Sequence, residues 1–246
     1  QIAVTMQTKH TPSNRFVAEL KSGEHAEPRF NLADYAVLMK PRVMSLVVFT
    51  ALVGLLLAPG SIDPWTATAA IVFIALGAGA AGAINMWYDR DIDLQMSRTM
   101  NRPLPAGRMH PGPALAFGTV MAFAAVLSMA YYVNLMSATL LLVTILYYVF
   151  VYTVWLKRLT PQNVVIGGVS GALPPVVGWA SVTGSIDSGA LSLFLIIFLW
   201  TPPHSWALAL YRRGDYEAAG VPMLPVAAGV QATKRQMTYY TVLLLP

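Results

Sequence analysis

The apolar positions of the chain gather into long runs separated by short polar stretches. Runs of about 20 apolar residues can cross the hydrocarbon core of a bilayer as helices. Six runs follow one another: 43–59, 65–88, 113–133, 136–156, 163–182 and 190–211. Each is predicted to be a membrane-spanning helix, with a break at Pro174-Pro175 in the fifth and an interruption at Pro202-Pro203 in the sixth.

The two ends of the chain differ from these runs. Residues 1–42 are polar and of mixed charge, and we expect a flexible segment up to about Phe30 followed by a short interfacial helix over 31–39. A seventh apolar run begins near Gln236 and stops at Pro246, which is too short to cross a bilayer. The predicted organisation is therefore an N-terminal segment, 1–42, and one transmembrane domain, 43–246, truncated within its seventh span.

Composition agrees with a helical membrane protein. Of the 246 residues, 56% are hydrophobic and the mean hydropathy is +0.57, too apolar for a soluble domain with a hydrated surface. The chain has no cysteine, which excludes disulfides and thiolate metal sites.

The cations lie on one side of the predicted membrane. The loops after the first, third and fifth runs contain no Lys or Arg, so all 16 basic residues fall in the N-terminal segment and in the other loops. By the positive-inside rule this side is cytoplasmic. We expect the plasma (inner) membrane of a bacterium, since no Arg- and Ser-rich, acid-poor presequence favours a mitochondrial inner membrane. No basic stripe with interleaved aromatic residues indicates nucleic-acid binding.

Candidate chemistry is concentrated after the second run. Asn85, Asp89 and Asp93 are spaced at i, i+4 and i+8, which stacks them along one side of a helix. Asp91 is expected to point elsewhere. Mg²⁺ is typically held by one or two carboxylates while substrate phosphate and water complete its shell. A carboxylate pair at this spacing is often only a solvated helix face, but ionisable groups at membrane depth favour a functional site.

A second polar group follows the sixth run on the same side. Asp215 follows Arg212 and either extends the metal site or belongs to a solvated loop. His204 follows two prolines, and two interpretations remain open for it. It is either a buried histidine bonded to a carbonyl that a proline has freed, or a contact for a haem-like group, since imidazole suits iron.

The motifs resemble those of the UbiA-type intramembrane prenyltransferases. NxxxDxxxD at 85–93, followed by Arg98-Thr99 and Arg102-Pro103-Leu104, resembles the first motif of that superfamily. TPPHSWALAL at 201–210 and DYEAAGVPMLP at 215–225 are similar to the members that farnesylate protohaem IX. The likeness covers nearly the whole chain. It departs from the superfamily in the second motif, where only Asp215 fits.

The resemblance implies an all-α polytopic bundle with nine helices, of which six complete spans and part of a seventh are present. It implies transfer of a farnesyl group from farnesyl diphosphate to a vinyl group of protohaem IX, with Mg²⁺ (or Mn²⁺) as cofactor. The catalytic residues it implies are Asn85, Asp89, Asp93 and Asp215, the three aspartates being the metal ligands. The substrate-binding residues it implies are Lys40, Arg42, Arg98, Arg102, Lys157, Arg158, Asn163, His204 and Arg212.

Membrane lipid surrounds such an enzyme, and association with downstream haem enzymes or with a second copy is a further expectation. Two alternatives stay open at this point. One is a related prenyltransferase acting on an aromatic acid or a quinone precursor. The other is a cation-coupled transporter, which would favour carboxylates near the bilayer midplane and internal repeats.

Overall fold

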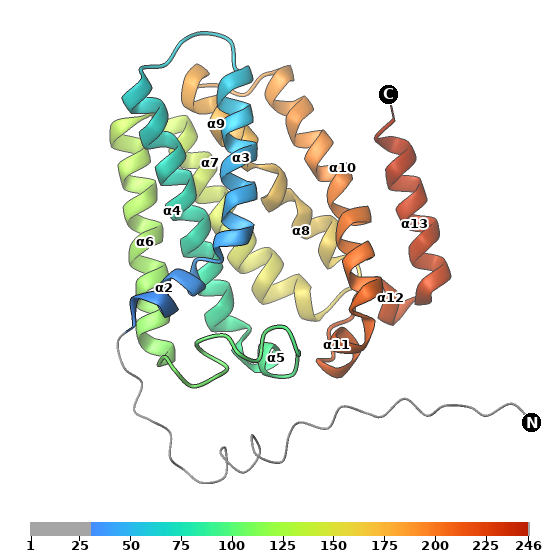
Figure 1. The fold of residues 1–246 in the computed structure, drawn as a ribbon. Coiled ribbons are helices and arrows are strands. Elements are labelled where there is room, and N and C mark those ends of the chain that lie inside the picture. Colours follow the sequence, from blue (N-terminus) through green and yellow to red (C-terminus); the bar gives the residue numbers. More distant parts are fainter. Residues whose placement is uncertain (1–30, 246) are drawn as a thin grey trace, which may run out of the picture.

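The computed structural model describes residues 31–245, and every regular element in that range is a helix. The long helices run up and down in one bundle whose connections lie at two opposite ends (Figure 1). The elements are α2 (Leu32–Leu38), α3 (Pro41–Leu57), α4 (Pro64–Tyr88), α5 (Arg90–Leu94), α6 (Pro111–Tyr132), α7 (Leu135–Leu146), the π-helix η1 (Tyr147–Trp155), the 3₁₀ turn η2 (Leu156–Arg158), α8 (Asn163–Ala172), α9 (Pro174–Thr183), α10 (Ser188–Tyr211), α11 (Arg213–Ala218), α12 (Leu224–Ala227) and α13 (Gly229–Leu243).

The predicted apolar runs are confirmed as helices. Within 31–245, five helical segments are long and apolar enough to cross a membrane: Pro64–Tyr88, Pro111–Tyr132, Leu135–Arg158, Asn163–Thr183 and Ser188–Tyr211. α2 and α3, bent by 53° at their junction, make a sixth if the pair is one span. The all-helical membrane bundle is therefore as predicted, while the total of nine helices stays a prediction.

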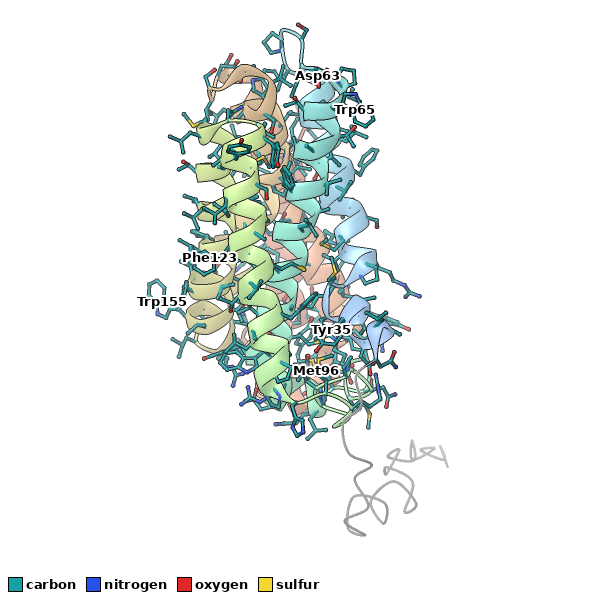
Figure 2. The ribbon with its side chains drawn as sticks, turned by 90° about the vertical axis from the view of Figure 1, so that its left-hand side faces the viewer. Tyr35, Asp63, Trp65, Met96, Phe123 and Trp155 are labelled. Atoms are coloured by element: carbon teal, nitrogen blue, oxygen red, sulfur yellow. The ribbon has the colours of Figure 1, made fainter. Side chains whose placement is uncertain are left out.

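The long sides of the bundle are apolar on the outside. Phe123 and Trp155 are 66% and 60% exposed, and Figure 2 shows both pointing away from the bundle. Asp63 and Trp65 lie at one end of the molecule, and Met96 lies at the other (Figure 2). Apolar flanks with polar ends are the surface expected of a bundle that has lipid around its sides.

Two glycines let α3 and α9 pack backbone to backbone. A Cβ atom at Gly54 would lie 2.0 Å from the Pro175 carbonyl oxygen, and one at Gly178 would lie 2.0 Å from that of Ala51. Small residues at such crossings are typical of membrane helices, which gain their association from close packing.

The prolines of α10 do not interrupt the helix, so the expected interruption at Pro202-Pro203 is wrong. The helix runs from Ser188 to Tyr211 with both prolines inside it. A proline removes a hydrogen bond to the preceding turn. In membrane helices, neighbouring helices and Ser or Thr side chains re-satisfy such freed groups. Here the Thr201 hydroxyl lies in the same turn and donates to the neighbouring Ile197 carbonyl at 2.7 Å, rather than to the Phe198 and Leu199 carbonyls, whose N–H partners the prolines remove.

The expected interfacial helix over 31–39 is α2, and the Asn31 side chain caps it by accepting a hydrogen bond from the Ala33 N–H at 3.0 Å.

The last helix, α13, begins at Gly229, before the apolar run that starts near Gln236. The first half of α13 carries Lys234 and Arg235, so the pattern of apolar runs did not identify it as helix. The expected flexible segment up to Phe30 lies outside the described residues.

The connections that carry basic residues share one end of the bundle. α5, α11 and the lower ends of α4 and α10 lie together there (Figure 1). α2 is tied to the same end, because Arg108 donates to the buried Asp34 carboxylate at 3.0 Å. The fold thereby gathers the predicted site residues from segments far apart in the sequence.

Candidate active site

Asn85, Asp89 and Asp93 form a continuous buried row at the end of α4. Asp89 lies between α4 and α5, yet the helical hydrogen bonds continue through it. The Asp89 N–H donates to the Asn85 carbonyl at 2.9 Å, and the Asp93 N–H to the Asp89 carbonyl at 2.8 Å. All three side chains are buried. The structure therefore brings these predicted residues together along one side of the chain.

Asp89 and Asn85 are surrounded by hydrogen-bond donors. Asn85 Nδ2 donates to Asp89 Oδ2 at 2.8 Å, and Lys157 Nζ forms an ion pair with the same oxygen. Arg158 Nη2 lies 3.6 Å from Asp89 Oδ1. Lys40 Nζ donates to Asn85 Oδ1 at 2.5 Å. Lys40 has a left-handed backbone (φ 53°) at the α2–α3 bend, a conformation that non-glycine residues rarely adopt and that places its side chain at the site.

Asp93 is paired by the loop that follows α5. Arg102 Nη1 donates to Asp93 Oδ2 at 2.6 Å, and the buried Thr99 hydroxyl donates to the Asp93 carbonyl at 2.8 Å. Each buried aspartate of the row therefore has its own cation, as burial of a charge in an apolar medium demands.

Asp91 points away from this row, as the spacing predicted, and binds Arg158. The two side chains form a bidentate pair with N–O distances of 2.6 and 2.7 Å, and the guanidinium also covers the Tyr88 ring at 4.9 Å. The Arg158 hydrogen bond holds the pKa of Asp91 below its ordinary value. Planar bidentate pairing fixes orientation as well as charge. It joins the α5 segment to η2, which carries Lys157.

Two buried oxygens at this site have no hydrogen-bond partner among the described residues: Asp89 Oδ1 and Asn163 Oδ1. Asn163 begins α8 and donates from Nδ2 to the Lys157 carbonyl at 3.3 Å, so it supports the turn that presents Lys157. Buried acceptors without a donor are costly and call for an explanation, such as a ligand or an ion.

Asp215 and Arg98 belong to a neighbouring group. Ser97 Oγ donates to the Asp215 carboxylate at 3.1 Å, and Arg98 Nη2 donates to the Tyr216 hydroxyl at 3.3 Å. These contacts join the loop after α5 to α11. Asp215 does not gather with Asp89 and Asp93: within 31–245, no three His, Asp or Glu side chains lie close enough to form a metal site by themselves.

Three predicted substrate-binding residues lie apart from the row. Arg42 is exposed in the first turn of α3, and Arg212 lies over the Tyr211 ring at 5.0 Å. His204 is exposed, so the alternative of a buried, satisfied histidine is wrong; it stacks on Trp200 with ring centres 4.2 Å apart. Since α10 continues through its prolines, His204 lies on a helix surface one turn after Trp200.

An apolar cavity of about 150 Å³ adjoins the buried row. It runs between α3, α4, α7, α8 and α9, and Lys40 lines it together with Tyr148, Gly82 and Gly171. Lys40 therefore contacts both the row and the cavity, because its ammonium binds Asn85 and its side chain borders the cavity. The arrangement places an apolar chamber beside a group of paired charges.

Two partners of the site residues carry no mark in the sequence. Thr153, buried in η1, accepts a hydrogen bond from Asn85 Nδ2 of the row at 2.9 Å, and Ser97, in the loop after α5, donates to Asp215 in the neighbouring group. Thr153 lies within an apolar run, 68 positions from Asn85, and a polar residue inside a predicted span is the available signal for it. Ser97 has no such signal.

The residues of the row fit a hard divalent cation. Mg²⁺ prefers oxygen ligands and usually takes one or two carboxylates, with substrate phosphates completing its shell. Asp89, Asp93 and Asn85 supply such oxygens, and Asp89 Oδ1 has no hydrogen-bond partner among the described residues. A third carboxylate is not needed for this mode of binding, so the separate position of Asp215 does not conflict with it.

Comparison with known proteins assigns the chain to a family. The model of the UbiA prenyltransferase family matches residues 47–246. A protein of Rhodopseudomonas palustris (strain CGA009) named protohaem IX farnesyltransferase is 61% identical over 214 residues, which are 87% of this chain and 69% of that protein. A protein of the same name from Parvibaculum lavamentivorans is 59% identical over 213 residues, 87% of this chain and 67% of the relative.

Solved structures share the fold at low identity. A UbiA homologue from Archaeoglobus fulgidus, bound to DMAPP and Mg²⁺, superposes with a TM-score of 0.69 at 17% identity, covering 86% of this chain and 75% of that one. A digeranylgeranylglyceryl phosphate synthase superposes with a TM-score of 0.70 at 19% identity, covering 87% and 74%. With its membrane helices and its matched motifs, the chain belongs to the UbiA prenyltransferase family and is an integral membrane protein.

Proposed function

We propose that this protein transfers the farnesyl group of farnesyl diphosphate to a vinyl group of protohaem IX, with addition of water, giving haem O and pyrophosphate. The relatives at about 60% identity carry the name of this activity. The observation that carries the proposal is the junction at Lys40, where the buried charged row meets the apolar cavity. A prenyl diphosphate is the class of substrate with one charged end and one apolar end.

The charged end of the substrate is assigned to the row. Lys40, Lys157 and Arg102 surround Asn85, Asp89 and Asp93 and can exchange these partners for diphosphate oxygens. Fixed cations that face the leaving pyrophosphate stabilise the negative charge that develops as the C1–O bond breaks. The site is held in place before the substrate arrives by the Arg158–Asp91 pair and by Asn163.

A divalent cation, Mg²⁺ or Mn²⁺, belongs to this proposal. Asp89 and Asp93, with the amide oxygen of Asn85, are the residues that would hold it. Bound there, the cation supplies Lewis-acid charge to the diphosphate oxygens. Asp215 binds Ser97 rather than the row, so its role as a third metal ligand stays a prediction, as does the contact of Arg98 with the diphosphate. His204, Arg42 and Arg212 lie outside the row, and their predicted contacts with substrate stay predictions.

The apolar cavity is assigned to the farnesyl chain. Its lining is mostly apolar, and both Tyr148 and Lys40 belong to its wall. An apolar wall excludes water from the allylic cation, and a ring face can stabilise positive charge.

By the positive-inside rule, the basic end of the bundle is proposed to face the cytoplasm of a bacterium from its plasma membrane, which also puts the N-terminus in the cytoplasm.

The test is product formation by membranes that carry the full-length protein. Farnesyl diphosphate, protohaem IX and Mg²⁺ are supplied, and extracted haems are analysed by mass spectrometry. We expect hydroxyethylfarnesyl haem that disappears when a chelator removes the metal. Prenylation of 4-hydroxybenzoate with no haem product would overturn the choice of acceptor. The absence of any prenylated product from folded, inserted protein would overturn the proposed activity.

A further inference from the structure

Thr153 is fully buried in η1 and contacts the row from a different span. Its Oγ1 accepts a hydrogen bond from Asn85 Nδ2 at 2.9 Å and donates one to the Tyr148 carbonyl at 2.9 Å. Because a hydroxyl has a single proton, the bond to Tyr148 leaves only its lone pairs for Asn85. Thr153 therefore presents an acceptor, and only the NH₂ side of the Asn85 amide can face it.

This direction of bonding determines how the Asn85 amide is turned. One N–H of Asn85 Nδ2 points at Asp89 Oδ2 and the other at Thr153, which leaves Oδ1 facing Lys40. The reversed amide would place its oxygen against the Asp89 carboxylate and its NH₂ group against the Lys40 ammonium. The Asn85 amide has three side-chain partners: Lys40, Asp89 and Thr153. Thr153 is the uncharged one, so a metal ion or a diphosphate would not draw it away from Asn85.

We propose that Thr153 is a positioning residue that keeps the Asn85 amide oxygen turned toward the metal–diphosphate group. The inference rests on the proposed function. Asp89 also orients this amide, but its carboxylate is the group that a cation would engage. Thr153 then remains as the fixed acceptor for Nδ2. Groups that orient a ligand residue commonly change metal affinity by about 10–100-fold when they are removed.

The π-helix explains why a threonine at this position reaches both partners. In an α-helix the Thr153 hydroxyl would find the carbonyl of residue 149, but the i→i+5 pattern of η1 brings the Tyr148 carbonyl to it. The same turn places Tyr148 on the cavity wall. Short π-helical segments occur often at functional sites, where they aim side chains that an α-helix would not.

The experiment measures direct binding of farnesyl diphosphate to the purified full-length protein, with and without Mg²⁺. Thr153→Val removes the hydroxyl at nearly constant shape, Thr153→Ala is a second variant without a hydroxyl, and Thr153→Ser keeps it. Thr233→Val is the matched control, because Thr233 is equally buried but its hydroxyl donates to the Gly229 carbonyl within α13, away from the row. We expect Mg²⁺-dependent affinity to fall about 10-fold in Thr153→Val and Thr153→Ala, and to stay near wild type in Thr153→Ser and Thr233→Val.

A double-mutant cycle with Asn85→Ala separates positioning from general packing. If Thr153 acts through Asn85, then Thr153→Val causes no further loss of affinity in the Asn85→Ala protein. Independent, multiplying losses would overturn the inference, as would wild-type affinity in both hydroxyl-free variants. In either case the proposed function stands. Failure of the wild-type protein itself to bind farnesyl diphosphate with Mg²⁺ would instead overturn the proposed function and the inference with it.

Discussion

At the scale of single residues, the site is a balance of buried charges. Asp89 and Asp93 are offset by Lys157 and Arg102, while Lys40 bonds to a neutral amide. Removing one member of a buried ion pair leaves an uncompensated charge, which costs more than the net contribution of the pair. The resting site therefore depends on cations that the substrate would also use.

Replacement of Lys157 by Met tests this dependence without measuring activity. Loss of the ammonium leaves Asp89 short of one partner, so we expect a destabilisation of about 3 kcal/mol. Mg²⁺ that binds Asp89 would offset part of this loss. Thermal unfolding in detergent should then show a larger rise of the midpoint with Mg²⁺ in Lys157→Met than in the wild type.

Lys234→Met, on an exposed position of α13, is the control and should behave as the wild type does. Equal Mg²⁺ shifts in the wild type and in Lys157→Met would contradict the idea that this cation and the metal share Asp89.

Residue spacing was informative only where the contacts are local. The helical spacing of Asn85, Asp89 and Asp93 determines their common direction, so the row could be predicted from sequence. Lys157 and Thr153 approach from 68 positions away, and the direction of a buried side chain across a bundle has no signature in spacing. For His204, the adjacent prolines suggested burial, but a continuous helix turns it outward.

At the scale of elements, helix crossings without side chains between them set the shape of the bundle. The approach of α3 to α9 leaves no room for a Cβ at Gly54 or Gly178. We expect Gly178→Ala to lower the free energy of unfolding by about 1–3 kcal/mol, since the added methyl group meets backbone that cannot move aside. Thermal unfolding in detergent measures the loss.

Gly214→Ala is the matched control, because a Cβ at that exposed helical position of α11 meets nothing within 4 Å. It should leave stability unchanged or raise it slightly, as alanine favours a helix over glycine. If Gly178→Ala were as stable as Gly214→Ala, the close crossing of α3 and α9 would be wrong.

The elements themselves were largely predictable, because run length and hydropathy determine a membrane helix almost completely. Two kinds of feature were not. α10 contains Pro202 and Pro203, which would be expected to interrupt a helix, yet it stays helical. The start of α13 is charged and has no apolar pattern that would indicate a span. The π-helical register of η1 also leaves no mark in its composition.

At the scale of the whole molecule, the apolar cavity lies beside the charged row, and Lys40 borders the cavity while it binds Asn85. Gly171 lines the cavity, and a Cβ at this position has open space around it. Gly171→Leu should therefore fill the cavity rather than distort the helices. We expect it to raise the KM for farnesyl diphosphate about 10-fold or more, with a smaller effect on a five-carbon prenyl diphosphate, because only the longer chain needs the blocked volume.

Ser192→Leu, at an exposed position of α10 that does not line the cavity, is the control and should leave both KM values unchanged. The steady-state kinetics of the two diphosphates make the comparison. Equal effects of Gly171→Leu on the long and the short substrate would indicate that the cavity does not hold the chain.

Whether the buried row is the reaction site is tested by comparing two aspartates at opposite ends of the bundle. Asp89→Asn removes a charge from the buried row, and Asp63→Asn keeps a good N-cap for α4 at the far end. Haem extracts from membranes given Mg²⁺, farnesyl diphosphate and protohaem IX are analysed for hydroxyethylfarnesyl haem. We expect a loss of at least about 100-fold in Asp89→Asn and wild-type product in Asp63→Asn. Near-normal product from inserted Asp89→Asn protein would contradict the assignment of the row as the reaction site.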